Sequence, residues 1–352
     1  MSARIRSAAL LLCLFAVALS AAASAASKDG PLVGVSWSNF QEERWRRDES
    51  ALRAELQRLG ARYVSADAQS STEKQVADVE SLIARGADVL VIVAQDADAL
   101  HPAIALARAE GIPVIGYDRL IEVPGVFYLS FDNREVGRIQ ARAVLARRPR
   151  GRYAFIKGAA TDPNADFVYA GQRDVLDAAI ASGEIQVVGN QYVEGWLPET
   201  AQRIMEQILT ANGNRVDAVV CSNDGMASGV LVALKAQGLE GLPLSGQDGD
   251  HAALNRVARG VQTVSVWKDA RTLGRAAARV ALELARGVPG PRIEGVRVWT
   301  AGARGTPVDA ILLEPVPITR ENLDLVIDAG WITRAAVCRG AAANPPRACS
   351  GD

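Results

Sequence analysis

The sequence contains very little histidine and none of the residue spacings that common catalytic or metal sites require. His101 and His251 are its only histidines. It has no HExxH pair, no cluster of cysteine and histidine at metal-binding spacing, no GxSxG elbow and no GxxxxGK[ST] phosphate loop. Hydrolytic and phosphoryl-transfer chemistry therefore lack their usual residues. We expect no metal site, no cofactor and no enzymatic activity, and we predict that both histidines lie on the surface.

The chain also lacks an excess of charge of either sign. Its 39 lysines and arginines against 40 aspartates and glutamates give a formal net charge of −1. Such a balance creates no long-range field that would attract nucleic acid. We therefore expect no nucleic-acid partner, and we interpret the basic run at 147–152 as a solvated turn.

Only one apolar run is long enough to be a targeting segment, and it lies at the N-terminus. Arg4 and Arg6 precede an apolar run at 8–19, and small residues follow it at 23–25. This order is typical of a secretory signal peptide, and the run is shorter than the roughly 20 residues of a membrane-spanning helix. We predict a signal peptide over residues 1–26 and an exported, monomeric mature protein.

Cysteine is scarce as well, with three residues remaining after position 26. Cys221 lies in an apolar strand and is predicted to be a buried thiol. Cys338 and Cys349 lie in a tail, residues 336–352, that is rich in alanine, proline and glycine. In an exported protein, two cysteines this close in the chain favour a local disulfide.

What the sequence does contain is strand and helix in regular alternation. Residues 88–119 form one complete unit: an apolar run at 89–93, a helix whose apolar residues recur every three or four positions, and a second apolar run at 114–117. Such alternation predicts an α/β fold with parallel sheets. The predicted strands are 32–36, 62–66, 89–93, 114–117, 126–130, 152–156, 185–192, 216–221, 242–245 and 262–267.

The length after the leader exceeds what one hydrophobic core usually serves, so two domains are expected. A second set of strand and helix units begins near residues 130–134, which predicts two similar, doubly wound, parallel-sheet domains. We assign residues 30–132 and 266–302 to a first lobe, residues 133–265 and 303–335 to a second lobe, and residues 336–352 to a tail.

Polar and indole side chains follow the predicted strands at the points where the strands end. The carboxyl ends of parallel strands share one edge of a sheet, and ligands bind there. Planar donors and acceptors suit the hydroxyls of a polyol, and aromatic rings suit its C–H faces. The candidate site residues are Arg44, Trp45, Asp118, Arg119, Asp162, Asn164, Trp196, Asn223, Asp248 and Lys268.

Each candidate has a plainer explanation when it is taken alone. Asp118 and Asn164 could cap helices, and Trp196 could pack under the helix that follows it. Asp248 and Asp250 form a carboxylate pair of the kind that serves glycosidases, although nothing near them favours a protonated acid. The candidates form a site only as a set, because chance rarely places so many on the loops of one sheet edge.

Several stretches also resemble the type I periplasmic sugar-binding family. These stretches are EERWRRD, GIPVIGYDRL, LSFDNREVGRIQA, DPNAD, YVEGWLPETAQRIME, VDAVVCSNDG and SGQDGD. The resemblance implies two α/β lobes joined by a three-strand hinge that close over one sugar, with D-xylose the closest match. It implies that Trp45 and Trp196 stack on the sugar. It also implies that the hydroxyls are bound by Arg44, Arg119, Asp162, Asn164, Asn223, Asp248 and Lys268.

The expected function is therefore capture of an aldose in the periplasm and its delivery to the membrane permease of an ABC importer. An alternative is a sensor subunit that presents glucose, arabinose or a related aldose to a chemoreceptor or histidine kinase. Two rivals come from other classes. A sugar-responsive repressor would carry a DNA-binding helix-turn-helix where this chain has its leader, and an exported glycosidase would cleave aryl xylosides.

Overall fold

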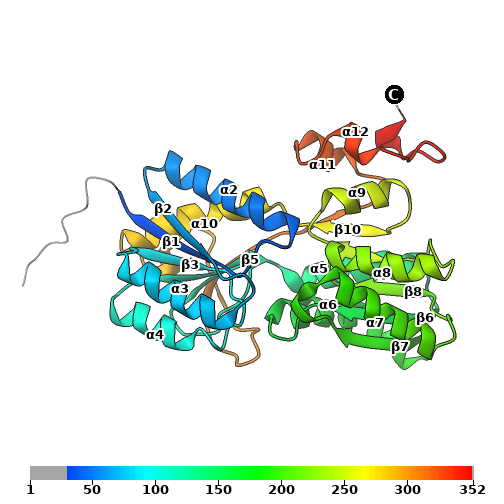
Figure 1. Ribbon diagram of the computed structural model, residues 1–352, viewed down its shortest axis with the longest axis horizontal. Coiled ribbons are helices and arrows are strands. Elements are labelled where there is room, and N and C mark those ends of the chain that lie inside the picture. Colours follow the sequence, from blue (N-terminus) through cyan, green and yellow to red (C-terminus); the bar gives the residue numbers. More distant parts are fainter. Residues whose placement is uncertain (1–29, 351–352) are drawn as a thin grey trace, which may run out of the picture.

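The computed structural model describes residues 30–350, which form two α/β lobes side by side (Figure 1). The predicted signal peptide lies outside the described residues. Within residues 30–350, no helix has the length and apolar character needed to cross a membrane.

Strand and helix alternate as predicted, and each of the ten predicted strands overlaps a strand of the structure, but 242–245 overlaps β9 only at Ser245, and β11, β12 and β13 were not predicted. The strands are β1 (Leu32–Trp37), β2 (Arg62–Asp67), β3 (Val89–Ile92), β4 (Val114–Tyr117), β5 (Phe127–Phe131), β6 (Gly151–Lys157), β7 (Ile185–Tyr192), β8 (Ala218–Cys221), β9 (Ser245–Gln247), β10 (Val264–Trp267), β11 (Arg297–Trp299), β12 (Val308–Leu313) and β13 (Val316–Ile318). The helices are α2 (Glu43–Arg58), α3 (Thr72–Ala84), α4 (His101–Ala109), α5 (Asn133–Arg147), α6 (Pro163–Ala181), α7 (Pro198–Ala211), α8 (Asp224–Ala236), α9 (His251–Ala258), α10 (Ala270–Ala285), α11 (Asp324–Asp328) and α12 (Arg334–Val337). Short 3₁₀ turns are η1 (Glu194–Trp196), η2 (Gly290–Arg292) and η3 (Arg347–Cys349).

The first lobe is a seven-stranded sheet in the order β11-β12-β5-β4-β3-β1-β2, covered by helices on both faces. Successive side chains of a strand point to opposite faces, and β3 shows why its run is continuously apolar. Val89 and Val91 join the core that packs under α2 and α10, whereas Leu90 and Ile92 join the core under α3 and α4. Both faces of the strand are therefore buried, as the unbroken apolar run predicts.

The second lobe has the same organisation. Its strands form two three-stranded groups, β7-β6-β8 and β13-β10-β9, which an isolated parallel bridge between Val219 and Leu244 connects. The core on one face lies under α7 and α8, and the core on the other lies under α5 and α6. The two lobes are thus similar doubly wound domains, as predicted.

The chain passes between the lobes three times: between β5 and α5, between β10 and α10, and between β12 and β13. The assignment of residues 303–335 to the second lobe is wrong for β12. That strand pairs in parallel with β5, placing Ala310 opposite Tyr128, and so completes the first sheet. Only from β13, which pairs antiparallel to β10, does the chain lie in the second lobe.

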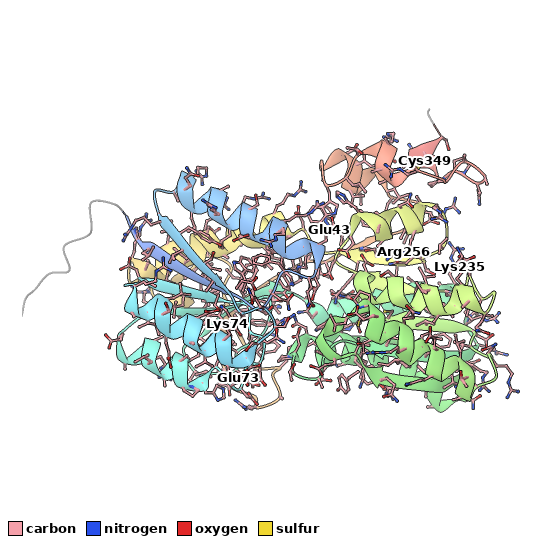
Figure 2. The ribbon with its side chains drawn as sticks, viewed as in Figure 1. Glu43, Glu73, Lys74, Lys235, Arg256 and Cys349 are labelled. Atoms are coloured by element: carbon pink, nitrogen blue, oxygen red, sulfur yellow. A yellow bond between two sulfur atoms is a disulfide. The ribbon has the colours of Figure 1, made fainter. Side chains whose placement is uncertain are left out.

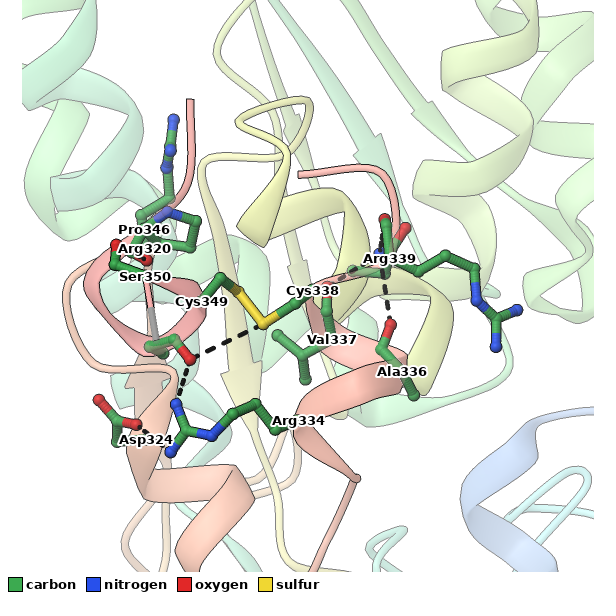
Figure 3. Close-up of a disulfide and its surroundings, with 12 residues drawn as sticks. Arg320, Asp324, Arg334, Ala336, Val337, Cys338, Arg339, Pro346, Cys349 and Ser350 are labelled. Carbon is green, nitrogen blue, oxygen red and sulfur yellow. Dashed lines mark hydrogen bonds and ion pairs between the residues drawn. A yellow bond between two sulfur atoms is a disulfide. The ribbon is translucent and has the colours of Figure 1, made fainter. Parts of the chain in front are cut away.

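The predicted disulfide is present (Figure 3). Cys338 follows α12 and Cys349 ends η3, and their Cα atoms lie 5.4 Å apart. Arg334 donates hydrogen bonds to the carbonyl of Ala348 and to Asp324, so the segment around the disulfide is ordered by more than the covalent bond. Cys221 is a buried free thiol, also as predicted.

Protein produced in an oxidising compartment without residues 1–26 should contain one free thiol, that of Cys221. Closing the loop between Cys338 and Cys349 lowers the entropy of the unfolded chain, which should stabilise the folded protein by about 3 kcal/mol because the segment is ordered there. Thiol counting on denatured, unreduced protein measures this directly. A count of three thiols would show that the disulfide does not form.

Candidate functional site

All ten predicted site residues line one cavity between the two lobes. The first lobe supplies the start of α2 after β1 and the turn after β4. The second lobe supplies the loops after β6, β7, β8 and β9, and the crossing after β10 contributes the last residue. The carboxyl ends of parallel strands from two sheets therefore face each other. The lining residues are Glu42, Arg44, Trp45, Asp118, Arg119, Asp162, Asn164, Trp196, Asn223, Gln247, Asp248 and Lys268.

Buried ion pairs centred on Arg44 connect the lobes across this cavity. Arg44 Nη1 lies 2.9 Å from Asp118 Oδ1 in its own lobe and 3.4 Å from Asp248 Oδ1 in the other. Lys268 Nζ lies 3.4 Å from Asp118 and 3.7 Å from Asp248. All four side chains are almost completely buried, so these charges depend on one another for compensation.

A second group of polar contacts crosses between the lobes beside the first. Arg119 Nε lies 2.9 Å from Asp162 Oδ2. Asn164 Nδ2 lies 3.1 Å from both Asp118 Oδ2 and the Asp118 carbonyl, to which it donates hydrogen bonds. The helix cap here is Asp162, which accepts a bond from the Asn164 N–H, so the capping role considered for Asn164 is wrong. Asn223 caps α8 in the same way, which shows that a cap can also line a site.

The backbone is strained at three of the lining residues. Among residues 30–350, six non-glycine residues have positive φ, and three of them line this cavity: Asp118 at 61°, Trp196 at 60° and Asp248 at 99°. Such conformations cost free energy and persist where the surrounding structure determines them, most often at functional sites. Because the backbone has positive φ at these three residues, their side chains leave the turns in directions that an ordinary φ would not allow.

The two indole rings lie at the cavity with different surroundings. The Trp196 ring packs so closely on Gly158 that a Cβ there would lie 2.0 Å from it, and the ring joins the core of the second lobe. The Arg44 guanidinium lies 4.4 Å from the Trp45 ring centroid, and Trp37 packs behind Trp45. Both indole N–H groups are buried and have no hydrogen-bond partner among the described residues. Trp196 therefore both supports the core, as a staple would, and lines the site.

Residues behind the cavity fix the position and charge of Arg44. Asp48, one helical turn along α2, lies 3.2 Å from Arg44 Nε, and the Tyr117 hydroxyl donates to the other Asp48 oxygen. Burial alone would lower the pKa of Arg44, but Asp118, Asp48 and Asp248 hold it well above its ordinary value. Burial alone would raise the pKa of Asp118, but Arg44, Lys268 and Arg119 lower it to about 2. Both groups therefore remain charged at neutral pH.

Two lining residues, Glu42 and Gln247, were missed in the sequence. Both lie inside stretches that carry the resemblance: Glu42 is the first residue of EERWRRD, and Gln247 is the residue of SGQDGD that ends β9 and precedes Asp248. Gln247 would have been a candidate if the last residue of each strand had been included with the residues that follow it. Burial and the charge of Asp248 raise the pKa of Glu42 to about 7, against the opposing effect of Arg119 and Arg44.

The raised pKa has a simple cause in the charge balance of the junction. The cations are Arg44, Arg119 and Lys268, and the carboxylates are Glu42, Asp48, Asp118, Asp162 and Asp248. Carboxylates thus outnumber cations, and a buried carboxylate without a matching cation binds a proton. Burial likewise raises the pKa of Asp48 to about 6.

The side chains fill most of the junction. They leave about 10 Å³ of room for the centre of a water molecule, which is close to the space of one water. A larger solute can enter only if its own polar groups take over the contacts that the side chains now make with one another. Within residues 30–350, no cluster of three or more metal-ligating side chains occurs. The planar donors and acceptors of the cavity are suited to an uncharged, hydroxyl-rich solute.

Two lobes that meet over a buried polar cavity and are joined by three chain crossings have the architecture of a solute-binding protein. Comparison with known proteins gives the family. Residues 33–289 match the family described as periplasmic binding protein domain. The chain belongs to this family and has its type I fold, and like its relatives it is a substrate-binding protein, not an enzyme.

The relatives share most of their length with this chain. A D-xylose-binding periplasmic protein of Haemophilus influenzae is 40% identical over 317 residues, covering 89% of this chain and 94% of the relative. A protein of the same description from Escherichia coli is 40% identical over 302 residues, covering 85% and 90%. A solved ABC transporter solute-binding protein of Clostridium phytofermentans with bound β-D-glucose is 31% identical, with a TM-score of 0.78, covering 87% of this chain and 99% of its own.

Glu42→Gln should stabilise the sugar-free protein in a pH-dependent way. The folded protein raises the pKa of Glu42 from 4.5 to about 7, so ionisation of Glu42 costs stability as the pH rises through this window. The variant should match the wild type near pH 4 and should melt about 3–8 °C higher at pH 8, where about 1–3 kcal/mol of this cost is removed.

Thermal unfolding from pH 4 to pH 8 measures this difference. Glu110→Gln is the matched control, because Glu110 is exposed at the end of α4. It should show no pH-dependent difference from the wild type. An equal shift for Glu42→Gln at pH 4 and pH 8 would contradict the assigned protonation.

Proposed function

We propose that this periplasmic sugar-binding protein of the ABC-transporter type captures an aldose between its lobes, and that the aldose is D-xylose. We further propose that it is exported to the periplasm by its N-terminal segment, acts as a monomer and delivers the sugar to a membrane permease. No cofactor takes part.

The single observation that carries this proposal is the convergence of charged forks and indole rings from both lobes on one buried junction. Guanidinium and carboxylate groups bind adjacent hydroxyls in pairs, because each presents two donors or two acceptors in one plane. A neutral sugar can accept from the arginines and donate to the carboxylates at once. It can therefore enter the network without leaving a buried charge unpaired.

In the proposed complex each side chain exchanges a protein contact for a sugar contact. Arg44 and Asp248 exchange their 3.4 Å contact for hydroxyls, and Arg119 and Asp162 do the same. Trp196 covers a C–H face of the ring. The proposed ligand set is Arg44, Trp45, Asp118, Arg119, Asp162, Asn164, Trp196, Asn223, Asp248 and Lys268.

Closure of the lobes is the proposed signal to the permease. A sugar that contacts residues of both lobes binds the closed state more tightly than the open state, and it shifts the population by that difference. The choice of D-xylose rests on the two relatives that are 40% identical and described as D-xylose-binding. Glucose, which is bound in solved structures about 30% identical to this chain, is the main competitor.

Calorimetric titration with D-xylose, glucose, arabinose, ribose and galactose tests the proposal. D-Xylose should bind in the micromolar range or tighter, which corresponds to about −8 kcal/mol or better. At a hundredfold excess over Kd it should stabilise the protein by about 2.7 kcal/mol. Failure of every sugar to bind would refute the function. Binding of arabinose or ribose without any effect of xylose on the melting temperature would refute the specificity.

Two variants on one turn provide a matched comparison for the titration. Asp248→Asn removes a carboxylate that lines the cavity and should weaken binding at least tenfold. Asp250→Asn changes a carboxylate two residues further on, which is outside the lining set, and should leave the affinity within about threefold. Equal effects of the two substitutions would show that the loss does not come from a sugar contact.

A further inference from the structure

The C-terminal segment, residues 319–350, packs on the second lobe beside α9, and Figure 1 shows it as a layer over that helix. It contains α11, α12 and η3 and is closed by the disulfide. It lies beyond residues 33–289, the part that matches the family description. Its apolar side chains share one core with α9 and β10. None of the residues that line the cavity belongs to this segment.

One residue of this segment, Trp331, contacts the backbone that carries the site. Its indole N–H donates to the carbonyl of Gly249 at 2.6 Å, and its ring lies 5.7 Å from the ring of Trp267. Gly249 directly follows Asp248, and Trp267 directly precedes Lys268. Trp331 is itself 3% exposed and lines no part of the cavity. It therefore supports two proposed ligand residues from behind.

The turn that Trp331 holds is strained, so support matters there. Asp248 and Gly249 both have positive φ, at 99° and 73°. A Cβ on Gly249 would lie 2.5 Å from Trp267 Cδ1, which shows how closely the turn packs on that ring. A turn in this conformation keeps its shape only while its neighbours determine it. The Trp331 hydrogen bond is one of those determinants.

The same residue also contacts the first lobe. Arg47, on α2 one turn from Arg44, donates to the Trp331 carbonyl at 3.1 Å, and its guanidinium lies 4.3 Å from the ring centroid. Arg271, on α10, donates to the carbonyl of Ala329 at 2.9 Å. These contacts cross between the lobes outside the cavity, near the start of α2, where Figure 2 labels Glu43.

His251 completes this outer contact. Its Nε2 lies 2.7 Å from the Trp331 carbonyl and 2.6 Å from Arg47 Nη2, and its backbone N–H donates to Glu43 at 3.3 Å. His251 lies on the surface, as predicted, with 39% of its side chain exposed, and its ring also contacts α2 and the C-terminal segment. The first turn of α9 thus belongs to the same interlobe contact.

We infer that Trp331 is a positioning residue for sugar capture: it fixes the Asp248 turn and, with Arg47, forms an outer contact that exists when the lobes are closed. The inference rests on the proposed function. A contact made in the closed state alone adds to the difference in affinity between the two states. It therefore slows release of the sugar rather than speeding its entry.

Two variants of the full mature chain, residues 27–352, separate this role from a merely structural one. Trp331→Phe keeps a ring in the core and removes the N–H, and Arg47→Met removes the outer contact. Each variant should lower the affinity for the tightest-binding sugar of the panel by about five- to tenfold, as measured by calorimetry. In stopped-flow measurements Arg47→Met should raise the dissociation rate by the same factor and leave the association rate unchanged. The sugar-free melting temperature of Arg47→Met should stay within about 2 °C of the wild type.

Arg46→Met is the matched control, because Arg46 is the neighbouring residue on α2 and its side chain is 67% exposed. It should bind sugar within twofold of the wild type. Wild-type affinity and release in Arg47→Met would overturn the inference, even if Trp331→Phe failed to fold. A wild-type protein that binds no sugar would overturn the proposed function and this inference with it. Sugar binding by the wild type with equal binding by Arg47→Met would overturn the inference alone.

Discussion

The buried charge of Arg44 is compensated by carboxylates from both lobes. This guanidinium is 2% exposed and lies within ion-pair distance of Asp48, Asp118 and Asp248. Removing one partner of such a pair leaves an unpaired buried charge and typically costs about 3–5 kcal/mol. Asp248 comes from the opposite lobe, so the pairing of the Arg44 charge depends on the two lobes lying close together. In the proposed complex, the hydroxyls of the sugar accept from Arg44 and donate to Asp248 in place of the direct contact.

The fold provides this arrangement through the directions of its parallel strands. Because the carboxyl ends of both sheets face the junction, short loops are enough to bring charges from many points of the sequence together. The strained turns at Asp118 and Asp248 then aim the two carboxylates at one guanidinium. The C-terminal segment adds support behind one of these turns through Trp331. Closure, charge pairing and backbone strain thus act on the same few residues.

Much of this could be predicted from the sequence because the relevant signals are local. Buried parallel strands are continuously apolar, and polar residues after a strand end are visible one strand at a time, which is how Asp118 and Asp248 were found. The sheet that β12 joins could not be predicted, because strand pairing depends on contacts distant in the sequence. The contacts of His251 could not be predicted for the same reason, since its partners Arg47 and Trp331 are far away in the chain. The raised pKa of Glu42 could not be predicted, because it depends on burial and on charges from the whole junction.

A crystal structure of the protein with D-xylose would show whether the sugar replaces the ion pairs between the lobes. We expect one sugar between the lobes, with its ring against Trp196 and its hydroxyls within about 2.5–3.2 Å of Arg44 and Asp248. The direct contact between those two side chains should be replaced by contacts to the sugar. A sugar bound elsewhere, or bound while the pairs of Arg44 with Asp248 and of Arg119 with Asp162 remain intact, would contradict this expectation.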